Sequence, residues 1–304
     1  RRLNTGMAHI NDSSVNDEIE RLRHSATAAL LGRRDVLIVA RVSCIYGLGS
    51  PEEYRATHVW LAEGDTLDRD VFLRRLTRIR YRRDDLSLAR GSFRVRGDVV
   101  EVGAADMQDR VARLEWFGDV IERIEEVDVL TGEVLARKPS ASFFPSSHYM
   151  NTDEALERAL VTIRAELTER LLWFAKHGKV AESDRLGRRV RYDLELLRET
   201  GFCPGIENYS RHLDGRQPGE APATLLEYFP EDFLLVVDES HVSLPQVAGM
   251  HAGDRRRKQN LVDYGFRLPS ALDNRPLTFA EFEARVDTAL YVSATPGATE
   301  RAKA

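Results

Sequence analysis

Runs of hydrophobic residues without alternation mark three segments of the chain as buried strands. Residues 233–237 are five consecutive apolar side chains, and residues 290–292 and, after its first residue Asp35, the segment 35–40 have the same character. This pattern is typical of strands that are covered on both faces, as in a parallel sheet with helices on each side. The sequence therefore predicts an α/β domain assembled from segments that lie far apart in the chain.

Two other stretches have the spacing of amphipathic helices. One apolar face before Gly32 consists of Val15, Ile19, Leu22, Ala26 and Leu30. Between residues 151 and 199, two apolar stripes are separated by His177-Gly178-Lys179. Such stripes at helical spacing, interrupted by a short break with a glycine, predict two antiparallel helices joined as an αα-hairpin.

Between residues 55 and 144 the pattern changes to short strands with turn signals, after a helical stretch near 71–79. Residues 92–96 and 99–102 alternate on either side of the two-residue turn Gly97-Asp98. We expect an inserted, mainly antiparallel α+β domain with one solvated face. The expected organisation is an α/β domain made of residues 1–54 and 201–304, an insertion at 55–148 and a helical hairpin at 149–200.

Composition narrows the class of protein. The 304 residues carry a net charge of −5, so a uniformly basic nucleic-acid-binding surface is excluded and any DNA contact must come from local patches. Two cysteines make no disulfide framework and suit a reducing cytosol. Because no apolar run approaches the roughly 20 residues that span a bilayer, we expect a cytoplasmic protein without a membrane partner.

The first candidate site follows the apolar run 233–237. Asp238 and Glu239 come directly after it, where ligands of open α/β sheets bind. One carboxylate suffices to hold a magnesium ion that keeps most of its waters, and the second can orient an attacking water. Ser293 and Thr295 occupy the same place after the run 290–292. The alternative interpretation is a strand end that simply meets solvent.

Two loops are candidates for nucleic-acid contact. The first contains Ser43, Tyr46 and Gly47, whose small residues let a backbone approach phosphates; its alternative is a plain turn. The second contains an aromatic and basic set that could stack on bases and hold phosphates, with ordinary core and helix capping as the alternative. Its members are Phe202, Asn208, Tyr209 and Arg211.

A third candidate is a set of arginines in the expected insertion. Arg94 and Arg96 alternate with Phe93 and Val95, so both point to one face of a strand, and Arg83 lies upstream. Interspersed acids weaken a phosphate-binding interpretation. A protein-docking patch and an ordinary solvated face both remain open.

Longer strings resemble a known family. Asp-Glu-Ser-His at 238–241, followed by Ser-Ala-Thr at 293–295, resembles motifs II and III of superfamily 2 helicases. The strings at 43–54, 201–213 and 264–277 resemble signatures of the UvrB family, the damage-verifying subunits of bacterial excinuclease. The resemblance covers residues 11–297.

The resemblance implies a RecA-like (P-loop NTPase type) parallel sheet domain, with ATP and Mg²⁺ as cofactors of the complete protein. It implies that Asp238 holds Mg²⁺ through water, that Glu239 acts on the attacking water, and that Ser293 and Thr295 lie near the nucleotide. The loops at 43–47 and 202–211 would then face damaged DNA. The insertion would dock UvrA through Arg83, Arg94 and Arg96, and the complete protein would recruit UvrC.

The chain departs from this family in one decisive respect. It has no phosphate-cradle string, Gly-x-x-x-x-Gly-Lys-Thr/Ser, and we find no second motor domain after residue 295. The motor would therefore be incomplete, and we expect this chain alone to bind no ATP or Mg²⁺ and to hydrolyse no ATP, since positioning of the phosphates supplies most of that catalysis. The alternatives are a protein-interaction module with vestigial motor motifs, or a fragment of another superfamily 2 helicase.

Overall fold

The computed structural model describes residues 3–107, 109–150 and 152–303, without the side chains of 3–17, 299 and 303. The chain forms two compact units, Arg1–Val36 with Tyr54–Met150, and Leu37–Glu53 with Asn151–Ala304. We call them unit 1 and unit 2. The helix at the start of the chain thus groups with the residues of the expected insertion, whereas we expected it with the α/β segments. The domain boundaries themselves stay a prediction.

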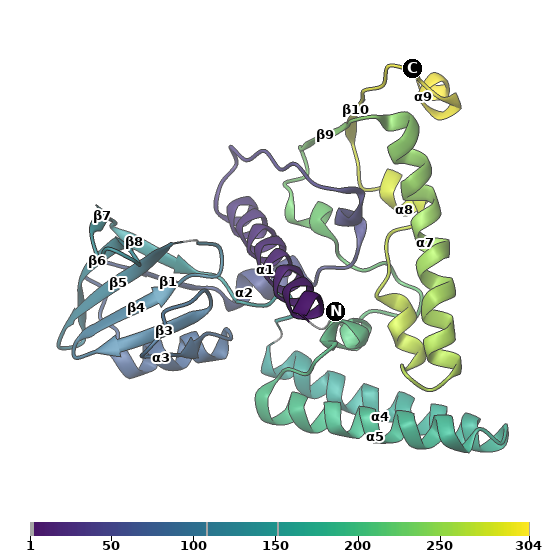
Figure 1. The fold of residues 1–304 in the computed structure, drawn as a ribbon, viewed down its shortest axis with the longest axis horizontal. Helices are drawn as coiled ribbons and strands as arrows, with labels where there is room; N and C mark the ends of the chain where they lie inside the picture. Colours follow the sequence, from purple (N-terminus) through teal and green to yellow (C-terminus); the bar gives the residue numbers. More distant parts are fainter. Residues whose placement is uncertain (1–2, 108, 151, 304) are drawn as a thin grey trace. The chain divides into compact units, whose positions relative to one another are not determined.

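Unit 1 is built on a six-stranded sheet in the order β2-β3-β4-β5-β6-β7, seen on the left of Figure 1. All neighbours are antiparallel except β2 and β3, which are parallel. A separate antiparallel pair joins β1 to β8. The bounds are β1 Val59–Ala62, β2 Arg82–Arg83, β3 Ser92–Arg96, β4 Val99–Gly103, β5 Arg110–Phe117, β6 Val120–Asp128, β7 Val134–Arg137 and β8 Ser140–Phe143.

Alternation along these strands produces the core of unit 1. Phe93, Val100 and Leu114 point to one face of the sheet and pack with Phe72 of helix α3 (Arg69–Arg78), and all four are buried. The indole Nε1 of Trp116 donates a 2.8 Å hydrogen bond to the carbonyl of Leu67. The expected hairpin around Gly97-Asp98 and the expected antiparallel character of this region are confirmed.

Helix α1 (Leu3–Gly32) also belongs to unit 1 and carries a buried polar cluster. The ring of His24 stacks on that of His148, with centroids 4.1 Å apart. His24 Nδ1 lies 3.1 Å from the hydroxyl of Tyr54, and Thr27 Oγ1 lies 3.2 Å from His148 Nε2. Burial, with a smaller contribution from the cations Arg23 and Arg90, lowers the pKa of His24 to about 4. Both imidazoles are therefore neutral at pH 7, because burial also lowers the pKa of His148.

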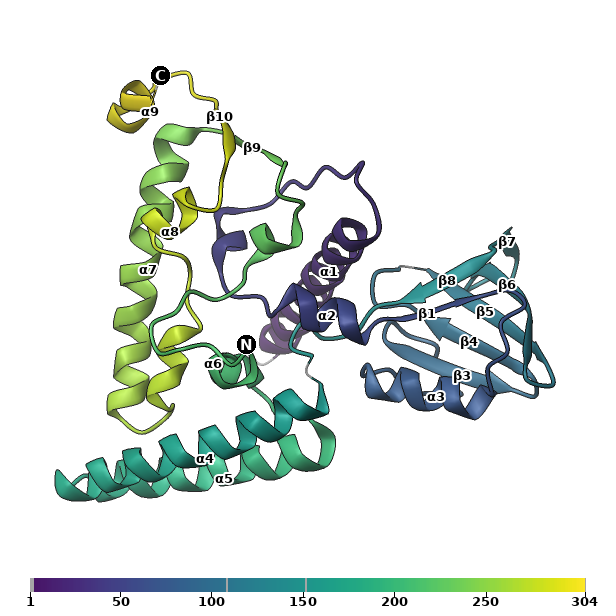
Figure 2. The same cartoon turned by 180° about the vertical axis from the view of Figure 1, so that it is seen from behind.

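Unit 2 contains the expected αα-hairpin, α4 (Asp153–Lys176) and α5 (Val180–Thr200), which run side by side in both views (Figures 1 and 2). A two-stranded parallel sheet joins β9 (Leu234–Val237) to β10 (Thr288–Tyr291). It lies near the start of the long helix α7 (Ser240–Asp263). The shorter helices are η1 Val42–Ile45, α2 Pro51–Thr57, η2 Ile206–Tyr209, α6 Ser210–Leu213, η3 Leu225–Tyr228, η4 Pro269–Asp273, α8 Phe279–Glu283 and α9 Ala298–Lys303.

Two expectations for the α/β part are wrong. Residues 35–40 form no strand, and Leu37 and Val39 are 88% and 93% exposed. On β9, Leu235 and Val237 pack against the core while Leu234 and Val236 are exposed, so only one face is covered. The physical reason is that a continuous apolar run becomes a doubly buried strand only when neighbouring strands and helices cover it.

The described structure is thus a mixed α/β fold with a multi-strand mixed sheet and separate helices. Among the described residues, no helix is both long and apolar enough to cross a membrane.

Candidate functional site

The ends of β9 and β10 lie next to each other. Val236 pairs with Leu290 and Val237 with Tyr291, and the ladder continues because Val292 N donates to Val237 O (2.9 Å). Ser240 N then donates to Val292 O (3.0 Å). The segments that follow, 238–239 and 293–295, therefore leave the same end of one small sheet. The two polar strand ends predicted from the sequence are therefore neighbours in one sheet, whereas the chemical roles of their residues stay a prediction.

Asp238 and Glu239 form a sharp turn between β9 and α7. Glu239 has left-handed backbone angles, φ 45° and ψ 49°, which are uncommon for a residue with a side chain. The hydroxyl of Ser243 donates to the carbonyl of Asp238 (2.9 Å) and holds the turn. Both carboxylates are exposed to solvent. They could therefore reach a hydrated magnesium ion, which needs few protein ligands.

Two side-chain contacts join the strand ends across the turn. His241 Nδ1 lies 2.8 Å from Ser293 Oγ and 3.4 Å from a carboxylate oxygen of Glu239. The Ser293 Oγ also accepts from the backbone N–H of Thr295 (3.1 Å). Ser293 is thus engaged in holding its own loop as well as His241. No group of three or more His, Cys, Asp or Glu side chains in the described part of the chain could enclose a metal ion.

A residue that sequence reasoning missed takes part in the same junction. Ser240, fully buried, donates from its hydroxyl to Glu300 Oε1 (2.7 Å), and Glu300 Oε2 accepts from Gly297 N (3.0 Å). Glu300 lies 60 positions after Ser240. No periodicity or motif in the sequence connects the two, so only the fold could reveal the contact.

The loop with Ser43, Tyr46 and Gly47 packs against the region before α8. Tyr46 forms an isolated bridge with Pro276. Burial, reinforced by the nearby carboxylate of Asp254, raises the pKa of Tyr46. A side chain at Gly47 would lie 2.9 Å from Asn274 Oδ1, so internal packing already explains this glycine. Ser43 is exposed, and a contact with DNA by this loop stays a prediction.

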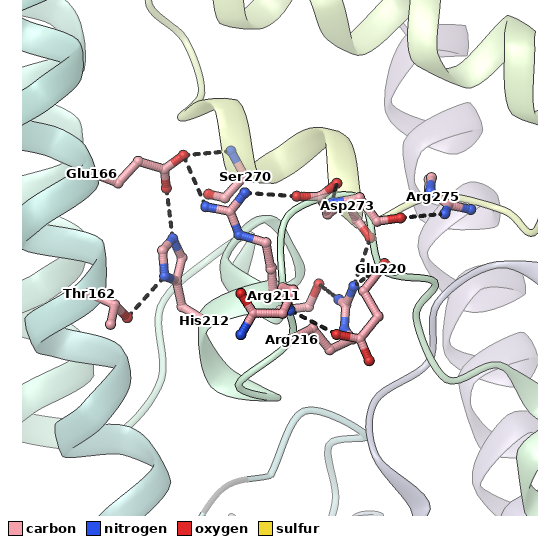
Figure 3. Close-up of polar contacts among 12 residues, drawn as sticks. Thr162, Glu166, Arg211, His212, Arg216, Glu220, Ser270, Asp273 and Arg275 are labelled. Atoms are coloured by element: carbon pink, nitrogen blue, oxygen red, sulfur yellow. Dashed lines mark hydrogen bonds and ion pairs between the residues drawn. The ribbon is translucent and has the colours of Figure 1, made fainter.

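The second candidate loop is tied to helix α4 by a polar network (Figure 3). Arg211 Nη1 donates to Asp273 Oδ2 (2.8 Å), and Arg211 Nη2 lies 3.4 Å from Glu166 Oε1. His212 lies between Glu166 Oε2 (2.7 Å) and Thr162 Oγ1 (2.9 Å). Burial opposes ionisation of Glu166, but hydrogen bonds from His212 and the Ser270 amide hold its pKa below the ordinary value.

The other members of this loop also have internal partners. The buried Tyr209 donates to Asp193 Oδ2 (2.7 Å), and the Asn208 side-chain amide donates to Gly205 O (2.7 Å). Phe202 is 37% exposed, and its carbonyl accepts a hydrogen bond from the Thr200 hydroxyl (3.0 Å). The geometry of Tyr209 and Arg211 favours the core-and-capping alternative, while the DNA role of all four residues stays a prediction.

The arginines of unit 1 differ strongly in their surroundings. Glu101 of β4 is buried and accepts hydrogen bonds from Arg94 and from Arg113, whose Nη2 lies 2.9 Å away. Arg83 Nε donates to Asp85 Oδ2 (2.9 Å). Arg96 is exposed and forms no ion pair within 4 Å with any residue that the structure describes. Of the three expected docking arginines, Arg96 is the one best placed to meet a partner.

The strand register explains this pattern. Arg94 lies opposite Glu101, Glu101 opposite Arg113, Arg113 opposite Glu125, and Glu125 opposite Arg137. One row of the sheet therefore alternates in charge across five strands. Opposite charges directly across an antiparallel pair are stabilising. The face is polar but not uniformly basic.

Comparison with known proteins matches most of unit 1 and the helical part of unit 2 to known domains. The family described as UvrB interaction domain matches residues 59–149, and the UvrB third helical domain matches residues 154–215. The UvrABC system protein B of Geobacillus kaustophilus is 60% identical over 289 residues, 95% of this chain. The chain belongs to the UvrB family. The proteins of the same name from Symbiobacterium thermophilum and Bacillus caldotenax are 60% and 59% identical over the same length.

The UvrB-type domains coincide with elements of the fold. The UvrB interaction domain begins at β1 and contains all strands of unit 1, and the third helical domain contains α4, α5 and α6. The chain spans 44% of the length of these UvrB relatives.

Proposed function

We propose that the chain is part of a nucleotide excision repair protein of the UvrB type, in which unit 1 docks UvrA. In the complete protein, unit 2 would belong to a RecA-like motor that uses ATP and Mg²⁺ to load onto damaged DNA before UvrC is recruited. The observation that carries the proposal is the 60% identity to UvrABC system protein B, together with the match to a domain described by its interactions.

The charged face of unit 1 supports the docking role. A protein partner that presents carboxylates can pair with the exposed guanidinium group of Arg96 and with the solvent-facing part of the Arg83 guanidinium. A nucleic acid is disfavoured here, because Asp84, Asp85 and Asp98 lie beside these arginines and repel phosphates.

The adjacent strand ends support the motor role. Asp238 would hold a magnesium ion through water, and Glu239 would orient the attacking water. The magnesium ion would neutralise charge that develops on the phosphates. His241 and Ser293 would keep the two loops in register. Since the chain has no phosphate-cradle string, we expect these groups to support hydrolysis only in a polypeptide that supplies one.

Titration calorimetry of the chain with UvrA tests the docking role. Arg96→Glu should weaken binding by about tenfold or more, because it places like charges opposite each other. The matched control is Arg188→Glu on helix α5 of unit 2, which should bind like the wild type. If UvrA does not bind the wild-type chain, or binds Arg96→Glu unchanged, the proposed docking is wrong.

A second candidate is a pure interaction module with vestigial motor motifs. The internal partners of Tyr209 and Arg211 favour it, because these side chains already have structural roles. Both candidates predict UvrA binding. Only the first predicts that a longer polypeptide with a phosphate cradle gains DNA-dependent ATP hydrolysis that Glu239→Gln abolishes. The matched families give no support to another helicase class.

A further inference from the structure

Leu86 is the most exposed large apolar residue of the described structure, at 97%. It lies in the loop that follows β2, the edge strand of the sheet in unit 1. A single exposed leucine on a surface is common and by itself needs no explanation. What distinguishes Leu86 is how its loop is held and what surrounds it.

Four hydrogen bonds fix the loop in place. Asp84 Oδ1 accepts from the amides of Leu86 (3.0 Å) and Ser87 (2.9 Å). Asp85 Oδ1 accepts from Val95 N of β3 (3.2 Å), and its Oδ2 accepts from Arg83 Nε (2.9 Å). Leu86 is therefore presented from a preorganised turn. Preorganisation lowers the entropy that a contact residue loses on binding.

The surroundings of Leu86 have the anatomy of a binding hot spot. Arg83 precedes it by three residues, and the bond from Val95 to Asp85 places the turn beside Arg96 on the next strand. An apolar residue with a polar, charged rim is the usual arrangement at the energetic centre of a protein interface. The carboxylates of Asp84 and Asp85 disfavour a phosphate-bearing partner at the same spot.

A second exposed apolar residue lies on the face of the sheet that carries Arg113. Phe117 is 80% exposed at the end of β5, and Trp116 before it points into the core. By strand alternation, Phe117 shares the face of Arg113 and Glu115. Leu86 and Phe117 are thus two exposed apolar residues of unit 1, and a partner with apolar pockets could contact both.

We propose that Leu86 is the apolar anchor of the docking region around Arg83 and Arg96, and that it inserts into an apolar pocket on the partner protein. This inference rests on the proposed docking of UvrA. It adds that apolar contact by Leu86 sets the lifetime of the complex, while the arginines set the rate and salt dependence of association.

Surface plasmon resonance with UvrA tests this division of roles. Leu86→Ala should weaken binding by about tenfold, mostly through faster dissociation, and should leave the salt dependence unchanged. The matched control is Leu130→Ala. Leu130 is 88% exposed in the turn between β6 and β7, at the opposite edge of the sheet. Both variants should melt like the wild type, because both side chains are solvated.

The outcomes separate the anchor from the docking itself. If Leu86→Ala and Leu130→Ala bind alike while Arg96→Glu loses affinity, the docking stands and the anchor is wrong. If Arg96→Glu and Leu86→Ala both bind like the wild type, both the anchor and the proposed docking are wrong. Leu86→Asp provides a second variant, since a charged carboxylate would have to enter an apolar pocket and should lower the affinity further than alanine does.

Discussion

The carboxylate of Glu101 lies between two guanidinium groups, with Arg94 on the strand before it and Arg113 on the strand after it. Burial opposes the charge, but the hydrogen bonds from Arg94 and Arg113 hold the pKa of Glu101 below its ordinary value. The two arginines and one acid form a unit whose geometry depends on all three.

Replacing Glu101 tests this unit. Glu101→Gln leaves two partly buried cations without a counter-charge, so we expect a loss of about 2–4 kcal/mol in the free energy of unfolding, measured by urea denaturation. Glu122→Gln, at an exposed position of the adjacent strand β6, should change stability by less than about 0.5 kcal/mol. Equal effects of the two substitutions would contradict the importance of the buried position.

The stacked imidazoles of His24 and His148 predict acid sensitivity. An ordinary histidine in the unfolded chain has its pKa near 6.5, whereas the folded pKa of His24 is about 4. The unfolded state therefore takes up protons first, and stability is lost as the pH falls from 6.5 towards 4, by roughly 3 kcal/mol for His24. Near the pair, Arg23 and Arg90 oppose protonation further.

Urea denaturation at several pH values measures this loss. His24→Phe should reduce the dependence between pH 6.5 and 4, with the contribution of His148 remaining, while Tyr54→Phe, which keeps both imidazoles, should retain all of it. A wild-type stability that is constant over this range would rule out the buried neutral pair.

Gly47 and Gly253 form a matched pair of glycines in unit 2. A Cβ at Gly47 would lie 2.9 Å from Asn274 Oδ1 and 3.0 Å from Pro222 Cβ, whereas nothing lies within 4 Å of a Cβ at Gly253. We expect Gly47→Ala to destabilise the protein by about 1–3 kcal/mol. Gly253→Ala, inside α7, should stabilise it by about 0.5–1 kcal/mol. Thermal melting distinguishes the two signs, and a stabilising Gly47→Ala would refute the packing explanation.

Arg211 provides a test of its structural role. Arg211→Ala removes the guanidinium that pairs with Asp273 and with Glu166, both largely buried, so we expect a loss of about 2–3 kcal/mol in unfolding free energy. Arg255→Ala, at an exposed position of α7, should have almost no effect on stability. If instead Arg211→Ala melts like the wild type and only DNA binding falls, the residue is a ligand for DNA and not a structural tie.

The sequence was most informative where local pattern decides structure. Alternation around Gly97-Asp98 located β3 and β4, and the glycine break at 177–179 located the hairpin of α4 and α5. It failed for residues 35–40, since the burial of an apolar run depends on which strands and helices cover it. The network of Arg211, Glu166 and Asp273 was missed because it joins residues that are dozens of positions apart.

The hydrogen bond between Ser240 and Glu300 ties the first turn of α7 to the chain that follows β10. The carboxylate of Glu300 also accepts a hydrogen bond from Gly297 N, so it joins two segments of backbone. A force on residues 298–303 would be transmitted to Asp238 and Glu239 through the hydroxyl of Ser240, without deformation of β9 or β10. In the proposed motor, this connection would let the position of residues 298–303 influence where the carboxylate of Glu239 points.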